Sequence, residues 1–306
     1  MTPSIPRVSV LIPARRAAAT IRATLEAAAG QTVRPGEILV YEDGRCDNLA
    51  AEVDAFATVA ACPVRLLGSE TNQGVSYARN ALLAAARGDF IAFLDADDIW
   101  GPDHLAHAVR CFDSGADIAF SGVTFIDAAG RPLPGRSAPS EQDLRDMAPA
   151  LFEYNFVQCT STVTVRREWL DRVGAFDEKL SHGEDLDLWL RLLGAGAVWQ
   201  FTGECSCAYR KHPSSAMGQT LLAVERLAAF YEKHLNNDLI PGEVRRRALI
   251  SNRRNHARLN WRQRPTEAAA ALRRLARLQP WNPLHPAAWL AVTAWSRWAR
   301  GDLRSA

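Results

Sequence analysis

Three carboxylates, Asp95, Asp97 and Asp98, follow the apolar run at residues 90–94. An apolar run of this length predicts a strand buried on both faces, and ligands of open α/β sheets bind beyond the carboxyl ends of such strands. Like charges this close repel one another, and a divalent cation offsets the repulsion. Hard oxygen ligands at Asp95 and Asp97 favour Mg²⁺ or Mn²⁺. The alternative is an acidic turn that only caps the next helix.

A second acidic pair, Glu184 and Asp185, begins the predicted amphipathic helix at residues 184–192. Acids in a first helical turn are favoured by the helix dipole, so capping alone could explain the pair. The chemical alternative is that one carboxylate, separate from the metal site, deprotonates an acceptor hydroxyl.

Predicted strands alternate with helices along the first hundred residues. Strands are expected at 7–13, 37–41, 63–67, 90–94, 116–123 and 156–165. One helix is expected at 17–30, and another is entered through the loop 72–80 and ends near Gly88. This alternation predicts an α/β fold with a mostly parallel, doubly wound sheet. The segment 130–139, rich in Gly and Pro, predicts an exposed loop.

Charge divides the chain into an acidic body and a basic tail. Residues 219–306 carry 16 Lys and Arg against 6 Asp and Glu, whereas the remainder carries 20 against 28. We therefore expect a catalytic domain at 1–218 that is distinct from the tail. The polar strand ends at about 1–100 fit a nucleotide-binding half, and the later acidic pair favours an acceptor-binding half at about 101–218. The basic tail at 219–306 predicts an anionic partner such as a membrane surface. Nucleic acid is not the expected partner, although charge alone does not exclude it.

The tail predicts a helical appendage with helices at 221–235, 244–259 and 265–278, whose arginine runs are expected to be solvated helix faces. The segment 281–299 places tryptophans and arginines around an apolar helix too short to span a bilayer, a composition suited to the headgroup boundary. Docking on the catalytic domain or on a second subunit is the alternative.

The six cysteines lack the CxxC spacing and predict free thiols in a reducing cytosol. Cys205 and Cys207 are expected to be small strand residues rather than metal ligands. The absence of a signal region or a long apolar run predicts a cytoplasmic protein, with contact on the inner face of the plasma membrane through the tail.

Six motifs together resemble the family-2 glycosyltransferases, over about residues 6–215. They lie at residues 8–14, 42–44, 72–80, 93–100, 174–178 and 183–185. The resemblance implies the GT-A fold and an inverting transferase that moves a sugar from a nucleotide-sugar, typically a UDP-sugar, to a glycan or lipid-linked acceptor. It further implies metal dependence and a place in cell-surface polysaccharide or lipopolysaccharide assembly.

The resemblance implies that several residues contact the donor. The backbone of Pro13 and Ala14 would lie against the nucleoside, and Arg15 directly after them would contact the nucleotide. Asp43 would hydrogen-bond the base, and Arg79 would lie near the diphosphate.

The remaining implied roles concern the metal and the acceptor. Asp95 and Asp97 form the DxD motif, with Asp97 as direct metal ligand and Asp95 as a ribose or metal-water contact. Asp185 would be the general base, and Glu184 would shape the acceptor site. His212 is a candidate contact to the metal or diphosphate, and a purely structural histidine is its alternative.

The sequence departs from the family pattern where the nucleotide would sit. Arg15 and Arg16 replace the usual Tyr-Asn, and Arg45-Cys46-Asp47 follows Gly44 where relatives carry Ser-Thr or Ser-Xaa-Asp. Two alternatives to an active transferase therefore remain: a catalytically idle nucleotide-binding or scaffold relative, and a sugar nucleotidyltransferase. The latter would be expected to carry a glycine-rich phosphate loop, which residues 13–16 lack.

Overall fold

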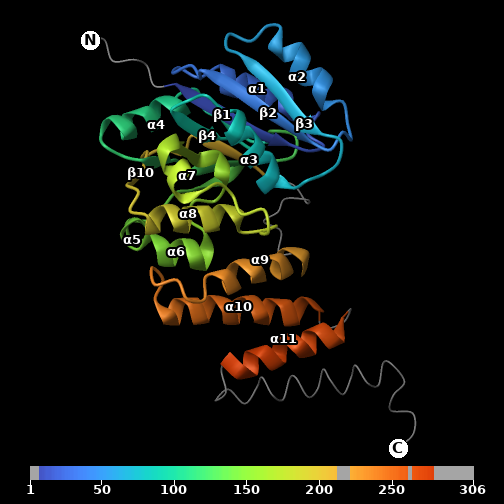
Figure 1. The fold of residues 1–306 in the computed structure, drawn as a ribbon, viewed down its shortest axis with the longest axis vertical. Coiled ribbons are helices and arrows are strands. Elements are labelled where there is room, and N and C mark those ends of the chain that lie inside the picture. The colour runs from blue at the N-terminus through green and yellow to red at the C-terminus, as the bar shows by residue number, and fades with distance from the viewer. Residues whose placement is uncertain (1–6, 212–220, 261–263, 279–306) are drawn as a thin grey trace, which may run out of the picture. The chain divides into compact units, whose positions relative to one another are not determined.

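A computed structural model of the chain describes residues 7–211, 221–260 and 264–278 (Figure 1). The chain consists of two compact units, Met1–Pro213 and Ser214–Ala306, and each is described by itself. The expected domain boundary at residues 218/219 lies in the undescribed range 212–220 and stays a prediction. His212 and the segment 281–299 also lie outside the described residues.

A seven-stranded sheet forms the centre of the first unit, in the order β10-β6-β9-β4-β1-β2-β3. Its strands are β1 (Val8–Ala14), β2 (Glu37–Asp43), β3 (Val64–Ser69), β4 (Phe90–Phe93), β6 (Ile118–Phe120), β9 (Val163–Arg166) and β10 (Trp199–Phe201). Neighbouring strands are parallel except at β9, which runs antiparallel to both β4 and β6. The predicted α/β class with a mostly parallel sheet is therefore confirmed.

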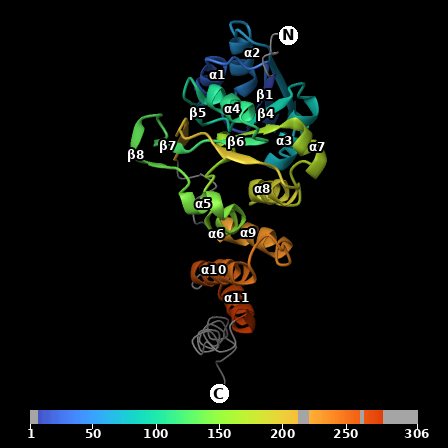
Figure 2. The same cartoon turned by 90° about the vertical axis from the view of Figure 1, so that its left-hand side faces the viewer.

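Helices cover both faces of this sheet (Figures 1 and 2). Alternate residues of β1, namely Val8, Val10 and Ile12, join one core with α1 (Ile21–Ala29), α2 (Leu49–Ala57) and α4 (His104–Asp113). The opposite face carries α3 (Val75–Ala85), α7 (Arg167–Val173) and α8 (Glu184–Gly194). Burial on both faces explains why the central strands β1, β2 and β4 carry nearly continuous apolar runs rather than alternating ones.

A smaller second sheet has the order β5-β11-β7-β8, formed by β5 (Ile99–Trp100), β11 (Cys207–Arg210), β7 (Val123–Ile126) and β8 (Pro132–Ser137). The expected single strand at 116–123 is in fact β6 and the start of β7, because the chain changes sheets at Gly122. A side chain there would clash, since a Cβ would lie 2.6 Å from Ser137 O. The expected exposed loop at 130–139 is wrong: it contains β8, an exposed edge strand where prolines are tolerated.

Two short helices and one turn complete the first unit. They are α5 (Glu141–Arg145), α6 (Met147–Tyr154) and the 3₁₀ turn η1 (Thr160–Thr162). The expected strand at 156–165 is therefore a turn followed by β9. This turn supplies two hydroxyls to the candidate site.

The second unit contains α9 (Leu221–Lys233), α10 (Gly242–Asn260) and α11 (Pro265–Leu278), close to the predicted helices. Apolar residues of α10 and α11, including Ile250, Ala257 and Leu272, form its core. The expectation that the arginine runs lie on solvated helix faces is wrong at Arg253, which is buried and ion-paired with Glu232 of α9. In the described part of the chain, no helix combines the length and apolarity needed to cross a membrane.

Candidate active site

The acidic turn joins β4 to β5 at the carboxyl edge of the central sheet. Asp95 and Asp97 are half-buried, whereas Asp98 is buried with 1% of its surface exposed. The Asp98 N–H donates to Asp95 O at 3.1 Å, which closes the turn. Two carboxylates therefore lie at the surface of the site, and the third points into the core.

Arg79, on α3, links the acidic turn to the start of α8. One guanidinium nitrogen donates to Asp95 Oδ1 at 2.8 Å, and the other terminal nitrogen donates to Glu184 Oε1 at 2.9 Å. The side chain is 5% exposed, and its guanidinium lies 5.3 Å from the centre of the Phe176 ring. Burial alone would lower the pKa of Arg79, but Asp95 and Glu184 raise it above its usual value. Arg79 is therefore a fixed positive charge between two carboxylates.

Thr160 and Ser161 of η1 were not predicted as site residues, yet their hydroxyls organise the acidic turn. Thr160 Oγ1 accepts from Arg79 at 2.8 Å and donates to Asp95 Oδ2 at 3.2 Å. Ser161 Oγ accepts from the Asp95 N–H at 2.9 Å and donates to Asp98 Oδ2 at 2.5 Å. Their only sequence signal is a run of hydroxyl residues, at 160–162, in a segment that becomes fully buried.

Asp98 stabilises the turn from below. Besides the Ser161 hydroxyl, it accepts the Arg210 N–H of β11 at 3.0 Å. Burial, reinforced by the nearby charges of Asp95 and Asp97, raises the pKa of Asp98 to about 8. The Arg210 guanidinium donates to Asp97 O at 2.8 Å, so β11 holds the turn at two points.

Glu184 and Asp185 form the first turn of α8, as predicted. Gly183, with φ of +76°, is the residue before the helix, so no side chain caps it there. Glu184 is ion-paired to Arg79, and Asp185 Oδ1 accepts the Leu186 N–H at 2.8 Å. Burial, followed by the charge of Glu184, raises the pKa of Asp185 to about 7, although Arg79 acts in the opposite direction. The pair thus does more than cap a helix.

Asp43, the predicted base contact, ends β2 and is 4% exposed. Its two oxygens accept the N–H groups of Gln73 at 2.6 Å and Gly74 at 2.9 Å. Gly74 has φ of +99° and precedes α3, so Asp43 fixes the start of the helix that carries Arg79. An ionised carboxylate has about four lone-pair positions, so the capacity to accept a further donor remains.

Pro13 and Ala14 are buried at the end of β1, where Ala14 pairs with Glu42 of β2. The residues that depart from the family pattern follow these two strands and are exposed: Arg15, Arg16, Arg45, Cys46 and Asp47. We call these five residues the nucleotide rim, because the family resemblance predicts that the nucleotide binds beside them. The structure thus connects Asp95, Arg79 and Glu184 directly, whereas Arg15 is exposed apart from that network.

Two further side chains hold the motif at residues 174–178 in place. Asn80 of α3 donates to Phe176 O at 3.0 Å and accepts its N–H at 2.9 Å. Arg191 of α8 donates to Ala175 O at 2.7 Å and to Asp187 at 2.9 Å. The motif therefore tethers α3 to α8, the two helices that present Arg79 and the acidic pair.

Comparison with known families decides the assignment. The model of glycosyl transferase family 2 matches residues 9–174, more than half of the chain. The chain belongs to this family. The matched range contains Arg79, the acidic turn and the hydroxyls of η1, while Glu184 and Asp185 lie beyond it.

Two bacterial relatives illustrate the similarity in sequence. The chain is 32% identical over 201 residues to the succinoglycan biosynthesis protein ExoO of Rhizobium meliloti, covering 63% of this chain and 57% of ExoO. It is 27% identical over 211 residues to the Escherichia coli glucosyltransferase WfaP, whose name gives UDP-Glc and α-D-GlcNAc-diphosphoundecaprenol; the match covers 68% of this chain and 78% of WfaP. The chain therefore spans little more than half of the length of ExoO.

Solved structures show the same fold. Staphylococcus aureus TarS in complex with UDP-GlcNAc matches with a TM-score of 0.64 at 19% identity, covering 89% of this chain and 81% of that one. The mannosyltransferase PcManGT of Pyrobaculum calidifontis, in complex with GDP-Man and Mn²⁺, matches with a TM-score of 0.62 at 18% identity, covering 96% and 81%. The family-2 chain has the predicted GT-A fold.

Proposed function

We propose that this protein is an inverting, divalent-metal-dependent glycosyltransferase that moves a sugar from a UDP-sugar to a hydroxyl of a glycan or lipid-linked acceptor. One observation carries the proposal: the buried Arg79 joins Asp95 of the acidic turn to Glu184, whose neighbour Asp185 has a pKa raised to about 7. In this proposal Asp95 belongs to the donor site and Glu184 to the acceptor site, and the Arg79 side chain joins the two.

In this proposal Asp185 is the general base. A base works best when its pKa lies near the operating pH, because it is then both deprotonated and able to hold the proton that it takes. Asp185 would receive the acceptor proton as the hydroxyl attacks the anomeric carbon from the face opposite the nucleotide. One displacement inverts the anomeric centre, so the chain needs no nucleophile of its own.

The acidic turn fits a hard divalent cation such as Mg²⁺ or Mn²⁺. Its half-buried carboxylates, Asp95 and Asp97, are the oxygen donors that such ions prefer. Following the DxD motif, we assign the direct contact to Asp97 and a water- or ribose-mediated contact to Asp95, whose carboxylate also accepts hydrogen bonds from Arg79 and Thr160. When bound, the ion would neutralise charge on the departing diphosphate. His212 stays a candidate further contact.

The nucleotide is assigned to the ends of β1 and β2. Pro13 and Ala14 offer backbone groups there, and Asp43 keeps the capacity to accept from a base N–H. Arg15, on the exposed nucleotide rim, is assigned to the phosphates by its charge. Four expectations stay predictions: a role in surface polysaccharide assembly, a cytoplasmic location, contact between the basic tail and a membrane, and oligomerisation.

Titration calorimetry with UDP, in the presence and absence of Mn²⁺, tests the donor site. We expect metal-dependent binding that Asp97→Ala abolishes and that Asp171→Asn, an exposed acid on α7, leaves unchanged. A screen of UDP-sugars would follow, with the anomeric configuration of the product read by NMR. If UDP, GDP, TDP and CMP all fail to bind, the idle-relative interpretation replaces this proposal. A product that retains the donor configuration would contradict inversion alone.

A further inference from the structure

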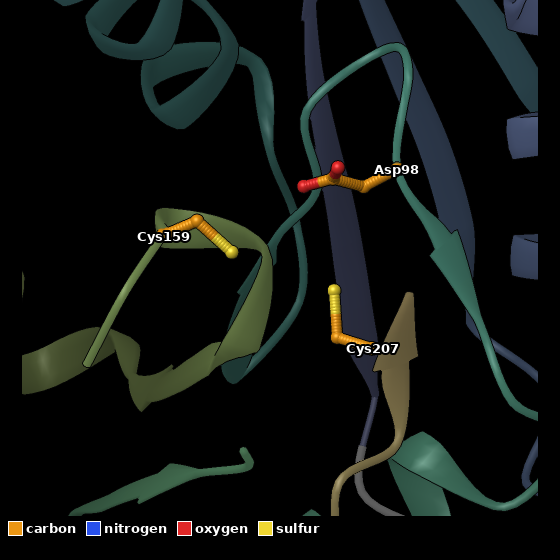
Figure 3. A group of neighbouring side chains, drawn as sticks. All are labelled: Asp98, Cys159 and Cys207. Atoms are coloured by element: carbon orange, nitrogen blue, oxygen red, sulfur yellow. The ribbon is translucent and has the colours of Figure 1, made fainter. Parts of the chain in front are cut away.

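Three potential metal ligands meet in the core beneath the acidic turn (Figure 3). Asp98 comes from the turn itself, Cys159 immediately precedes η1, and Cys207 begins β11. Their ligand atoms all lie within 4.8 Å of one another. The side chains are 1%, 6% and 0% exposed, respectively. Three segments, separated by 61 and 48 residues along the chain, therefore each contribute one ligand to a single buried point.

We propose that Asp98, Cys159 and Cys207 form a second cation site, selective for a thiophilic divalent ion of the Zn²⁺ type. Zn²⁺ binds thiolate sulfur at about 2.3 Å and carboxylate oxygen at about 2.0–2.2 Å, so ligand atoms around a tetrahedral ion lie about 3–4 Å apart. The spacing in the cluster is compatible with that geometry. Two sulfur ligands disfavour Mg²⁺, which separates this site chemically from the hard oxygen site at Asp97.

The surroundings of the cluster suit a cation that replaces protons. The two thiols are hydrogen-bonded to each other, and this contact together with burial raises the pKa of Cys159 well above its usual value. The same hydrogen bond lowers the pKa of Cys207, but burial together with the negative charges of nearby aspartates, Asp98 foremost, raises it overall. The thiols of the ion-free protein are therefore neutral. Binding of the ion would form two metal–sulfur bonds and one bond to an Asp98 oxygen. It would release both thiol protons and, where Asp98 is protonated, the carboxyl proton as well, so affinity should increase with pH.

Neighbouring groups show why this cluster is the stronger candidate. Cys205, only two residues before Cys207, is half-buried and donates to Ser137 O at 3.7 Å, and it is not a member of the cluster. Glu225, His256 and Glu267 form a second group of possible ligands in the helical unit. There, however, the Arg264 guanidinium already lies 3.4 Å from both glutamates, so a cation occupies the position.

The test uses the reduced full-length chain in excess Mg²⁺, which saturates hard oxygen sites, and titrates it with Cd²⁺. Cd²⁺ bound to thiolate gives an ultraviolet charge-transfer band that oxygen ligands do not give. We expect one such ion per chain, displaced by Zn²⁺. Cys159→Ser and Cys207→Ser should each weaken Cd²⁺ binding by more than about 10-fold. Loss of a residue that merely hydrogen-bonds to a metal ligand already lowers metal affinity by about that factor, and loss of a ligand should lower it further. Cys205→Ser and Cys46→Ser are matched controls and should bind normally.

Absence of the band in the wild-type chain would overturn the proposal, as would a band that survives both Cys159→Ser and Cys207→Ser. If either variant fails to fold, X-ray absorption of the Zn²⁺-loaded wild-type chain gives an independent answer. Two sulfur neighbours would support the site, and a shell of only oxygen and nitrogen would contradict it. None of these readouts requires nucleotide binding or turnover, so the result is independent of the proposed function.

Discussion

Two groups of charged residues lie along the same edge of the central sheet but are built in opposite ways. The acid network of Asp95, Arg79 and Glu184 is largely buried and joined by bonds of 2.8 and 2.9 Å. The nucleotide rim is exposed, and its Arg45 forms a solvated ion pair with Glu70 at 3.4 Å. Departures from the family pattern fall on the rim. We therefore expect substitution at the rim to change nucleotide recognition at little cost in stability, and substitution in the network to affect both.

Asp185→Asn should cause the largest loss of activity. Without the general base, kcat should fall about 10²- to 10⁴-fold while the affinity for UDP stays unchanged. Wild-type activity should rise with pH and level off above about 7, because Asp185 acts only when deprotonated. Steady-state kinetics of the wild type and of Asp171→Asn as control check both points. A flat pH profile, or full activity in Asp185→Asn, would remove this residue from the reaction.

Asp185 should lower the free energy of unfolding of the wild-type protein above neutral pH. Its pKa is raised in the folded state, so folding favours the protonated form, and that contribution is lost as the pH rises from about 4 to 7. Asp185→Asn has no such loss and should be more stable than the wild type at pH 8, by about 1–3 kcal/mol. Urea unfolding at pH 5 and pH 8 measures the difference, which should shrink at the lower pH. Equal differences at both pH values would contradict the raised pKa.

Arg79→Met should cause the largest loss of stability. Asp95 and Glu184 would remain as partly buried carboxylates without their cation, which costs about 3–5 kcal/mol. Arg79→Lys keeps the charge but cannot reach both acids with a rigid fork, so its loss should be smaller. Urea unfolding of both variants decides the point. If Arg79→Met lowered the free energy of unfolding by no more than the loss of a solvated ion pair would, Arg79 would not be the residue that stabilises the network.

Ser161→Ala should have an intermediate effect. It removes the acceptor of the Asp95 N–H and a donor to Asp98, so unfolding should become easier by about 1–3 kcal/mol. The affinity for Mn²⁺ should fall about 10- to 100-fold, because the hydroxyl orients the turn that carries Asp97. Ser114→Ala, which removes an exposed hydroxyl at the end of α4, is the control. Unchanged Mn²⁺ binding would mean that the turn keeps its geometry without Ser161.

The nucleotide rim should give the smallest change in stability. Arg15→Tyr combined with Arg16→Asn restores the usual family pair, and Arg45→Ala removes the solvated ion pair. Each variant should unfold within about 0.5 kcal/mol of the wild type, as expected for exposed positions. UDP binding should weaken at low salt in both, since each loses positive charge. A large loss of stability in either would erase the contrast with the acid network.

The sequence predicted most strands of the central sheet and located the acids in the chain, but it did not predict the side chains that hold those acids in place. Apolar strands reveal themselves through local composition, so β1, β2 and β4 were predicted close to their observed bounds. Arg79 was predicted to lie near the diphosphate, yet its partners Thr160 and Glu184 are 81 and 105 residues away in the chain. Local periodicity carries no information about such pairs. The hydroxyls of η1 were interpreted as strand residues for the same reason.

The edge strand β8 illustrates the opposite error. Its prolines and glycine predicted a loop because such residues normally interrupt a sheet interior. An edge strand is exempt, since one side of its backbone has no partner strand. Local composition therefore misleads at sheet edges, whereas it fails inside the site because the decisive contacts are distant.

The same strand bears on how the protein behaves at high concentration. An exposed sheet edge is a template on which another chain can add a strand, and Pro132 and Pro134 remove two of the six backbone donors that β8 could offer. Gly135 and the exposed Arg136 further disfavour a flat edge to which another chain could add a strand. Engineering this segment for rigidity with valine or threonine would improve its strand propensity. It would also create an unprotected edge for self-association, so the prolines act as built-in protection against aggregation.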